Sequence, residues 1–281
     1  MTLIFSDPIS LQKRGDGRAL SVQSLDLLQL GLDHSPIVMF DDFRVRGHPF
    51  APHPHAGFSA VTYVFDDSPG RLRSRDSLGN DYVVGRGGIV WTQAAHGVMH
   101  EEMLADPAAE LHGLQFFVNL TGMNKAIPPQ VFALEGDLVP VWTGPDGDRV
   151  HVVVGDYANK VSPVSPAEPF KLLDIQLVAG VELTQSDGWF GLIYARYDAV
   201  EITHAGGRVS VPAGTATTVE GTGTFRIHSA GNARPLFLSG PKVGERVIQH
   251  GPFIMSDPAE IAAARERYQR GEMGHLAPYH S

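Results

Sequence analysis

The sequence of 281 residues contains no cysteine, and this absence excludes several kinds of chemistry. A chain without thiols cannot form disulfides, hold an iron–sulfur cluster through thiolates or use a thiolate as a nucleophile. Any redox chemistry must therefore come from a bound group such as a metal ion.

Long apolar runs and an excess of basic residues are also missing. No stretch of about 20 apolar residues is present, so no membrane-spanning helix is expected. The first residues lack the basic region and apolar core of a secretion signal, so we expect a cytoplasmic protein with no membrane partner. Acidic residues outnumber basic ones 31 to 22, giving a formal charge of −9. This balance argues against direct nucleic-acid binding, which depends on Lys and Arg.

The composition and the spacing of apolar segments favour an all-β protein. Hydrophobic residues make up 43% of the chain and charged residues 19%, as in globular proteins with a full core. Short β-type segments follow one another closely, separated by turns rich in Gly, Asp and Pro, which is typical of a sandwich or barrel. One such series runs from Ala51 to about Leu120 and a second from Arg149 to Ser239, and 128–148 looks like their connection. The sequence thus predicts two domains, residues 1–135 and 136–281.

A helix is predicted only near the end of the chain. Asp257 can serve as its N-cap, Pro258 fits the first helical position and Glu260 completes a capping box. The following residues, to Arg270, are mostly good helix formers, and Gly271 can end the helix. Near the other end of the chain, the pattern of 25–32 leaves a short helix and a loop as alternatives.

The strongest candidate for chemistry is a pair of motifs, His53-Pro54-His55 and His100-Glu101-Glu102. Alternate residues of a β-strand point to the same face, so two neighbouring strands would direct His53, His55, His100 and Glu102 to a single point. Three imidazoles and one carboxylate suit a transition metal such as Fe, Mn, Co, Ni or Zn and leave positions for water or substrate.

A helical alternative uses His96 and His100, which are four residues apart and could bind a metal from one helix face. Glycines interrupt this segment, and its body, residues 89–92, is β-branched and aromatic, which favours a strand. We therefore expect a strand here and place His96 in a loop, outside the set of ligands.

These motifs resemble those of the cupin superfamily, whose members are jelly-roll β-barrels. Gly47 precedes His53 by six residues, as in the first cupin motif. Gly97 and His100 keep their places in the second motif, although Ala95 replaces its proline. Further landmarks span most of the chain and resemble the pirin family of bicupins: Asp41-Asp42-Phe43, His53-Pro54-His55-x-Gly57-Phe58, Arg75-Asp76-Ser77-Leu78-Gly79-Asn80, His100-x-Glu102, Gly113-Leu114-Gln115 and Gln249-His250-Gly251-Pro252-Phe253-Ile254-Met255.

The resemblance implies two tandem cupin domains with a C-terminal helix, and a metal in the first domain only. The second half keeps the spacing Gly206-x5-Pro212-x-Gly214-x2-Thr217, but Thr217 stands where the metal-binding histidine would be. No His-x-His occurs after residue 150. We therefore expect the second domain to lack metal ligands. Its expected role is to pack against the first domain, to shape the mouth of the pocket or to bind a partner.

For the site, the resemblance implies one divalent transition metal held by His53, His55, His100 and Glu102. Iron is the expected metal, and Mn, Co, Ni, Cu and Zn are alternatives. Similarity to pirins with quercetin 2,3-dioxygenase activity implies an oxidoreductase that uses dioxygen on a small aromatic, oxygen-rich substrate. Glu102 would be its catalytic base, a role that competes with its role as a ligand. Ser59 stands where many pirins carry Glu, a change expected to alter the surroundings of the metal without emptying the site.

Two other functions are compatible with the sequence. Resemblance to eukaryotic pirins implies a metal-dependent regulatory protein that binds a transcription factor or a metabolic enzyme, and an inherited scaffold with a vestigial metal is the third possibility. An enzyme needs an accessible apolar pocket. Six residues are candidates for its lining or for ordinary core: Phe40, Phe50, Phe58, Trp91, Met99 and Phe116.

Overall fold

The structure is a computed structural model that describes residues 2–15, 17, 19–25, 27, 35–47, 51–231 and 233–279. Strands dominate it, as predicted, and the longest helix is α2, Pro258–Gln269. Within these described ranges, no helix has the length and apolarity needed to cross a bilayer. Of the ambiguous segment 25–32, Leu25 ends strand β4 and Leu27 lies in a turn, while the remaining residues lie outside the described part of the chain.

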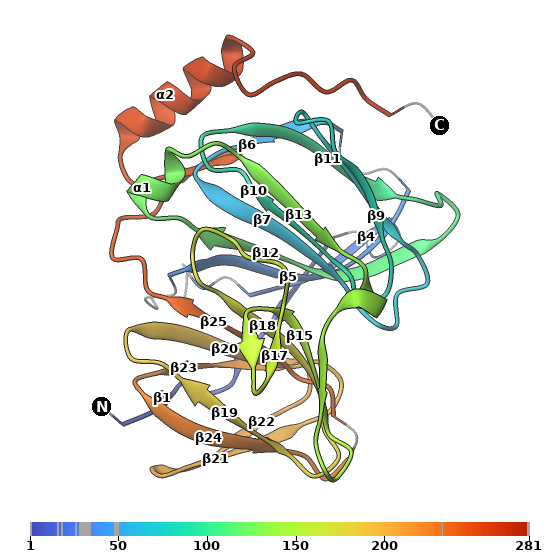
Figure 1. The fold of residues 1–281 in the computed structure, drawn as a ribbon, viewed down its shortest axis with the longest axis vertical. Helices are drawn as coiled ribbons and strands as arrows, with labels where there is room; N and C mark the ends of the chain where they lie inside the picture. Colours follow the sequence, from blue (N-terminus) through green and yellow to red (C-terminus); the bar gives the residue numbers. More distant parts are fainter. Residues whose placement is uncertain are drawn as a thin grey trace. The chain divides into compact units, whose positions relative to one another are not determined.

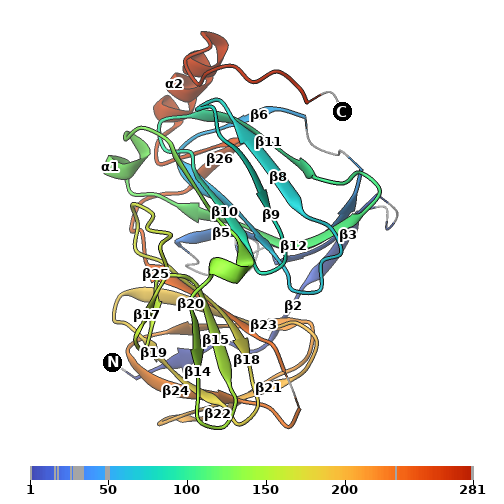
Figure 2. The ribbon, with the colours of Figure 1, turned by 45° about the vertical axis from the view of Figure 1, so that its right-hand side comes forward.

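The chain divides into two compact units. One, called here the histidine unit, comprises Gln12–Leu138 and Val243–Ser281. Its strands form a seven-stranded sheet in the order β13-β10-β7-β12-β5-β4-β3, a four-stranded sheet in the order β6-β11-β8-β9 and a two-stranded sheet of β26 and β27 (Figures 1 and 2). The bounds are β3 Gln12–Gly15, β4 Leu20–Leu25, β5 Ile37–Arg46, β6 His53–His55, β7 Phe58–Val64, β8 Leu72–Asp76, β9 Asp81–Val84, β10 Ile89–Gln93, β11 Val98–Leu104, β12 Glu110–Asn119, α1 Gly122–Lys125, β13 Gln130–Leu134, η1 Gly136–Leu138, β26 Ile248–His250 and β27 Phe253–Met255.

The second unit comprises Met1–Leu11 and Val139–Lys242. Its main sheet has the order β1-β23-β20-β25-β18-β15-β14, with β2 also paired to β23, and its four-stranded sheet has the order β19-β24-β21-β22. The bounds are β1 Ile4–Phe5, β2 Ile9–Ser10, β14 Val141–Thr143, β15 Arg149–Val154, β16 Asp156–Tyr157, β17 Lys160–Val161, β18 Lys171–Gln176, β19 Val181–Gln185, β20 Trp189–Ala195, β21 Val200–His204, β22 Gly207–Val211, β23 Thr215–Glu220, β24 Gly223–His228 and β25 Leu236–Pro241.

The two ends of the chain do not follow the predicted domains 1–135 and 136–281. The first strands, β1 and β2, pair with β23 of the second unit, although they precede the histidine unit in sequence. The C-terminal helix belongs to the histidine unit. The reason is apolar burial, since Met99 of β11 joins Phe253, Ile261 and Met273 of the C-terminal segment in one buried cluster. The predicted connection, 128–148, also contains β13 and β14.

The predicted start of the C-terminal helix is confirmed in detail. The Asp257 carboxylate accepts a hydrogen bond from the backbone N–H of Ala259, and the Glu260 side chain accepts from the N–H of Asp257. This reciprocal capping box satisfies donors that a helix start leaves open. Gly271 follows the helix with a positive φ of 74°. Figures 1 and 2 show α2 beside the blue and green strands of the histidine unit.

The inside of the second unit is filled by apolar side chains. Its buried cluster draws on both sheets and includes Leu173, Ile193, Phe225 and Phe237. Thr217 is fully buried, and its hydroxyl donates to the backbone carbonyl of Ser6, 2.8 Å away. At the position where a cupin histidine would stand, the side chain thus helps to hold the N-terminal segment in place.

Alternation along the central strands of the histidine unit decides which side chains face its interior. Strands β5 and β12 pair antiparallel, with Asp41 opposite Gln115 and Phe40 opposite Phe116. Directly paired residues point to the same face and successive residues to opposite faces. Asp41 and Gln115 therefore share one face, which borders an internal cavity, while Phe40 and Phe116 point to the other face and are fully buried there.

Candidate metal centre

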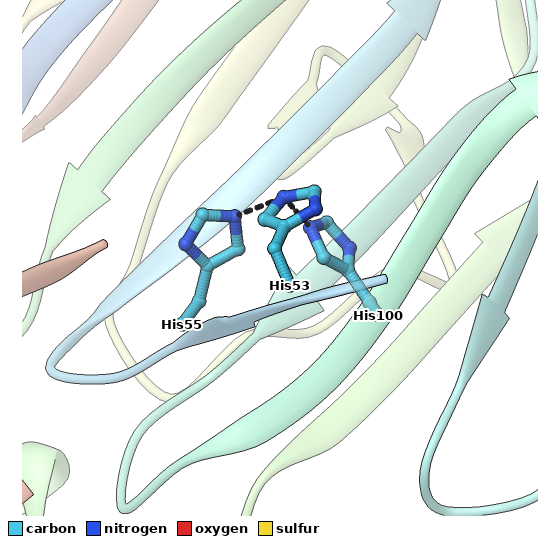
Figure 3. Close-up of side chains that lie close together, drawn as sticks. All are labelled: His53, His55 and His100. Atoms are coloured by element: carbon cyan, nitrogen blue, oxygen red, sulfur yellow. Dashed lines mark hydrogen bonds between the residues drawn. The ribbon is translucent and has the colours of Figure 1, made fainter. Parts of the chain in front are cut away.

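The structure brings His53, His55 and His100 together. Strands β6 and β11 run antiparallel, with His100 paired to His53 and Val98 paired to His55. The Nε2 atom of His53 lies 3.1 Å from that of His55 and 3.0 Å from that of His100 (Figure 3). Within the described residues, these three form the one group of His, Asp or Glu whose ligand atoms all lie within 4.8 Å of one another.

Backbone carbonyls fix the protonation of two of these rings. The Nδ1 atom of His53 lies 2.8 Å from the carbonyl oxygen of Ala51, and the Nδ1 atom of His55 lies 3.4 Å from that of Pro252. A carbonyl oxygen can only accept a hydrogen bond, so both Nδ1 atoms carry the proton. In the neutral rings, the Nε2 atoms that face the centre of the group are therefore bare lone pairs, as metal-binding histidines require.

Burial lowers the pKa of His55 and of His100. Desolvation, together with the positive charge that His53 would carry, lowers the pKa of His55 to about 3. The pKa of His100 also falls well below its usual range, first through burial and then through its two histidine neighbours. Bare lone pairs about 3 Å apart repel one another, and a cation between them removes that repulsion. The donor set thus fits a divalent transition metal, which imidazole binds well.

Glu102 lies two residues beyond His100 on β11 but is not in the group of three. Its carboxylate accepts hydrogen bonds from the Thr62 hydroxyl at 2.8 and 3.0 Å and from the Gln115 amide at 3.3 Å. Burial raises the pKa of Glu102 to about 7, although the Thr62 hydrogen bond works in the opposite direction. A carboxylate poised near neutral pH can take a proton from a bound molecule.

The carboxylate also borders an internal cavity of about 280 Å³. Of the six candidates for its lining or for ordinary core, none in the described part of the chain lines this cavity. Phe40, Trp91 and Phe116 are fully buried, and Phe58 packs against the rings of His55 and Phe117. Met99 borders a surface groove instead, and Phe50 lies outside the described residues. The actual walls are Leu20, Val22, Asp41, Phe43, Val45, Leu72, Glu102, Met103, Leu104, Leu111 and Gln115.

The structure also places two further residues that the sequence singled out, His96 and Ser59. His96 is exposed and lies in the turn between β10 and β11, outside the histidine group, as predicted. Ser59 is fully buried and pairs with Gln93, and its place next to Phe58 turns its side chain away from the face that carries Thr62. Ser59 and Thr62 therefore point to opposite faces of β7.

Sequence reasoning missed the residues that hold and surround Glu102. Thr62 sits in the middle of an apolar run, and its hydroxyl interrupts the hydrophobic pattern of β7 at an inward-facing position. Asp41 and Gln115 belong to longer motifs that give neither residue a role. The sequence feature that could have identified these residues is a polar side chain at an inward-facing position of a strand.

Two family models and several curated proteins match this chain. The pirin family model matches residues 21–118, and the model of the pirin C-terminal cupin domain matches residues 172–274. Human pirin is 32% identical over 248 residues, which cover 85% of this chain and 83% of that protein. A protein of Pseudomonas aeruginosa provisionally named a quercetin 2,3-dioxygenase is 32% identical over 249 residues, or 84% of this chain and 86% of that one.

Solved structures show the same fold. A quercetin 2,3-dioxygenase from Acinetobacter baumannii superposes with a TM-score of 0.83 at 23% identity, covering 99% of this chain and 100% of that one. A bacterial pirin from Escherichia coli in complex with nickel(II) superposes with a TM-score of 0.65 at 18% identity, covering 86% and 100%. The predicted pair of cupin domains is confirmed. This chain belongs to the pirin family.

Proposed function

We propose that this protein is a metal-dependent dioxygenase that acts on quercetin or a similar flavonol. The observation that carries the proposal is the convergence of His53, His55 and His100 next to a carboxyl group, Glu102, which lies two residues from His100 and borders an apolar cavity. The name of the Pseudomonas aeruginosa relative supports the same activity.

The metal would be held by His53, His55 and His100, with Glu102 as the fourth ligand, and iron is the metal we expect. When bound, a divalent transition metal supplies Lewis acidity and access to one-electron chemistry. The nickel(II) complex of the E. coli relative supports a metal in this fold without selecting one.

The residues of the chain perform the remaining tasks. Apolar walls such as Phe43, Leu72 and Leu104 would enclose the aromatic rings and exclude water. Glu102 would take the proton of the flavonol 3-hydroxyl, a general-base contribution typically worth about 10²–10⁴-fold. Thr62 and Gln115 hold that carboxylate in place. In the overall reaction, one dioxygen enters the heterocycle and carbon monoxide leaves.

The test begins with elemental analysis of protein purified without a chelator. Samples loaded with Fe(II), Mn, Co, Ni, Cu or Zn are then given quercetin under air and under argon. Loss of the near-visible absorbance of the flavonol, together with release of carbon monoxide, is followed for each metal. We expect oxygen-dependent turnover with at least one metal and none in His55→Ala.

Failure has two distinguishable forms. Absence of any stoichiometric metal would contradict every metal-dependent role of this site. Full metal loading with no turnover of any flavonol would contradict the dioxygenase proposal and favour the regulatory alternative. A pull-down of protein partners from the native host would then be the next measurement.

A further inference from the structure

The internal cavity extends from Glu102 away from the histidines. Glu102 and Leu104 of β11 both line it, whereas His100 of the same strand does not. Its volume of about 280 Å³ is close to the lower end of the range of about 300–1,000 Å³ usual for ligand pockets. A ligand that contacts Glu102 with one end can therefore place its other end in this cavity.

Three polar side chains interrupt the apolar walls, and they form one patch. Asp41 of β5 and Gln115 of β12 are direct cross-strand partners, so their side chains stand next to each other on the inner face. The Gln115 amide donates to the Glu102 carboxylate at 3.3 Å. Asp41, Gln115 and Glu102, called here the polar patch, thus form a continuous strip across the cavity.

The charge of the lining selects against anions. Two of the three polar residues are carboxylic acids, and no Lys, Arg or His is among the residues that line the cavity in the described part of the chain. An ionised carboxylate only accepts hydrogen bonds, so it favours a ligand that carries hydroxyl donors. A ligand with its own carboxylate would find no basic partner among these mostly apolar walls, which makes its burial costly.

We infer that Asp41, on the far side of Gln115 from Glu102, is a specificity-determining residue that binds hydroxyl groups on the end of the ligand remote from the histidines. The cavity therefore takes neutral, hydroxylated aromatic molecules and rejects small carboxylic acids. This inference rests on the proposed function, because it names the substrate class of the same site.

The test compares three flavonols that differ only in the hydroxyl groups of the outer ring: galangin with none, kaempferol with one and quercetin with two. Binding to metal-loaded protein is measured under argon by quenching of intrinsic fluorescence. The proteins are wild type and Asp41→Asn. Asp137→Asn serves as the matched control, since Asp137 is exposed on the same unit and lies outside the cavity lining.

In the wild type, we expect quercetin to bind about tenfold more tightly than galangin, as for a hydrogen bond to a charged group. Asp41→Asn should weaken quercetin binding by about tenfold and galangin binding by less than about twofold. Oxalate and salicylate should not compete at concentrations at which quercetin saturates the wild type. Asp137→Asn should bind all three flavonols like the wild type.

Each contrary result has its own meaning. Equal weakening of quercetin and galangin by Asp41→Asn would overturn the inference and leave the proposed function standing. Failure of the wild type to bind any flavonol would overturn both. If Asp41→Asn does not fold, quercetin methylated at both outer-ring hydroxyls tests the same point on the wild type. Unchanged affinity for that compound would also overturn the inference.

Discussion

The Nδ1 atom of His55 donates a hydrogen bond to the carbonyl oxygen of Pro252, a residue 197 positions later in the chain, across 3.4 Å. The same segment pairs with the histidine motif through the bridge between Ala56 and Phe253. The C-terminal hairpin therefore sets the tautomer of a candidate ligand. Partners of this kind hold metal-binding histidines in orientation, and their loss typically costs about 10–100-fold in metal affinity.

Gly57→Ala should separate this hairpin from the histidine motif. A Cβ at Gly57 would overlap the carbonyl oxygen of Ile254, and the positive φ of 88° strains any other residue there. We expect metal affinity to fall by about 10–100-fold, measured by competition with a coloured chelator. Gly79→Ala is the matched control, because Gly79 has a similar φ of 93° but no atom within 4 Å of the added Cβ. Equal affinity in the two variants would contradict a role for the hairpin.

His55→Ala should abolish stoichiometric metal binding. It removes one of three converging imidazoles from a buried site, and no fourth histidine of the described chain lies within reach. His204→Ala is the control, since His204 ends strand β21 of the second unit. Elemental analysis after removal of loosely bound metal would show about one equivalent in the control and none in His55→Ala. Retention of a full equivalent in His55→Ala would exclude this group as the metal site.

The sequence predicted the histidine group because its cause is local. Two short motifs with period-two alternation are enough to bring His53, His55 and His100 to one face, whatever the rest of the chain does. The strand order and the cavity lining have no local cause. Gln115 and Phe116 are neighbours in sequence, but the side chain of Gln115 lines the cavity and that of Phe116 points to the other face of the sheet. Which of the two faces the cavity depends on the register of the whole sheet.

The sequence could not predict, for a similar reason, that the N-terminal residues belong to the second unit and the C-terminal residues to the histidine unit. Strands β1 and β2 are two residues long, and only their pairing partner β23 defines them as strands. The hydrogen bond to the Pro252 carbonyl could not be predicted either, because a backbone acceptor leaves no mark on the residue type. Burial of Ile261 and Met273 against Met99 is a long-range contact that no short pattern encodes.

Asp148 gives the second unit a pH-dependent contribution to stability. Its Oδ1 atom accepts three backbone N–H groups, from Val178, Ala179 and Gly180, at 2.7–3.0 Å. Burial works to raise the pKa of Asp148, but these hydrogen bonds and the charge of Arg226 outweigh it, so the pKa is lowered. A lowered pKa in the folded state means that the contribution is present above the unfolded pKa of about 3.9 and is lost as the pH falls through the folded value.

Asp148→Asn keeps the shape and the acceptor but removes the charge. At pH 7 we expect the free energy of unfolding to fall by about 1–2 kcal/mol, since hydrogen bonds to charged groups are the stronger kind. The difference from the wild type should shrink as the pH is lowered from about 5 to 2. Denaturant titrations of both proteins at several pH values measure it. A difference that stays constant across this range would show that the charge is not the cause.

The last prediction concerns Glu102, whose carboxylate is held by Thr62 and Gln115. Glu102→Gln preserves size and can still accept the Thr62 hydroxyl, but an amide is no base and a weaker metal ligand. Turnover of quercetin should fall by about 10²–10⁴-fold, the usual worth of a general base, while metal content falls less. Thr62→Val separates orientation from proton transfer, because it removes the donor and leaves the carboxylate. We expect that variant to retain its metal and lose only about tenfold in turnover, as for one hydrogen bond to a charged group. Unchanged turnover in fully loaded Glu102→Gln would refute Glu102 as the base, and a parallel loss of metal and turnover would assign it to the metal instead.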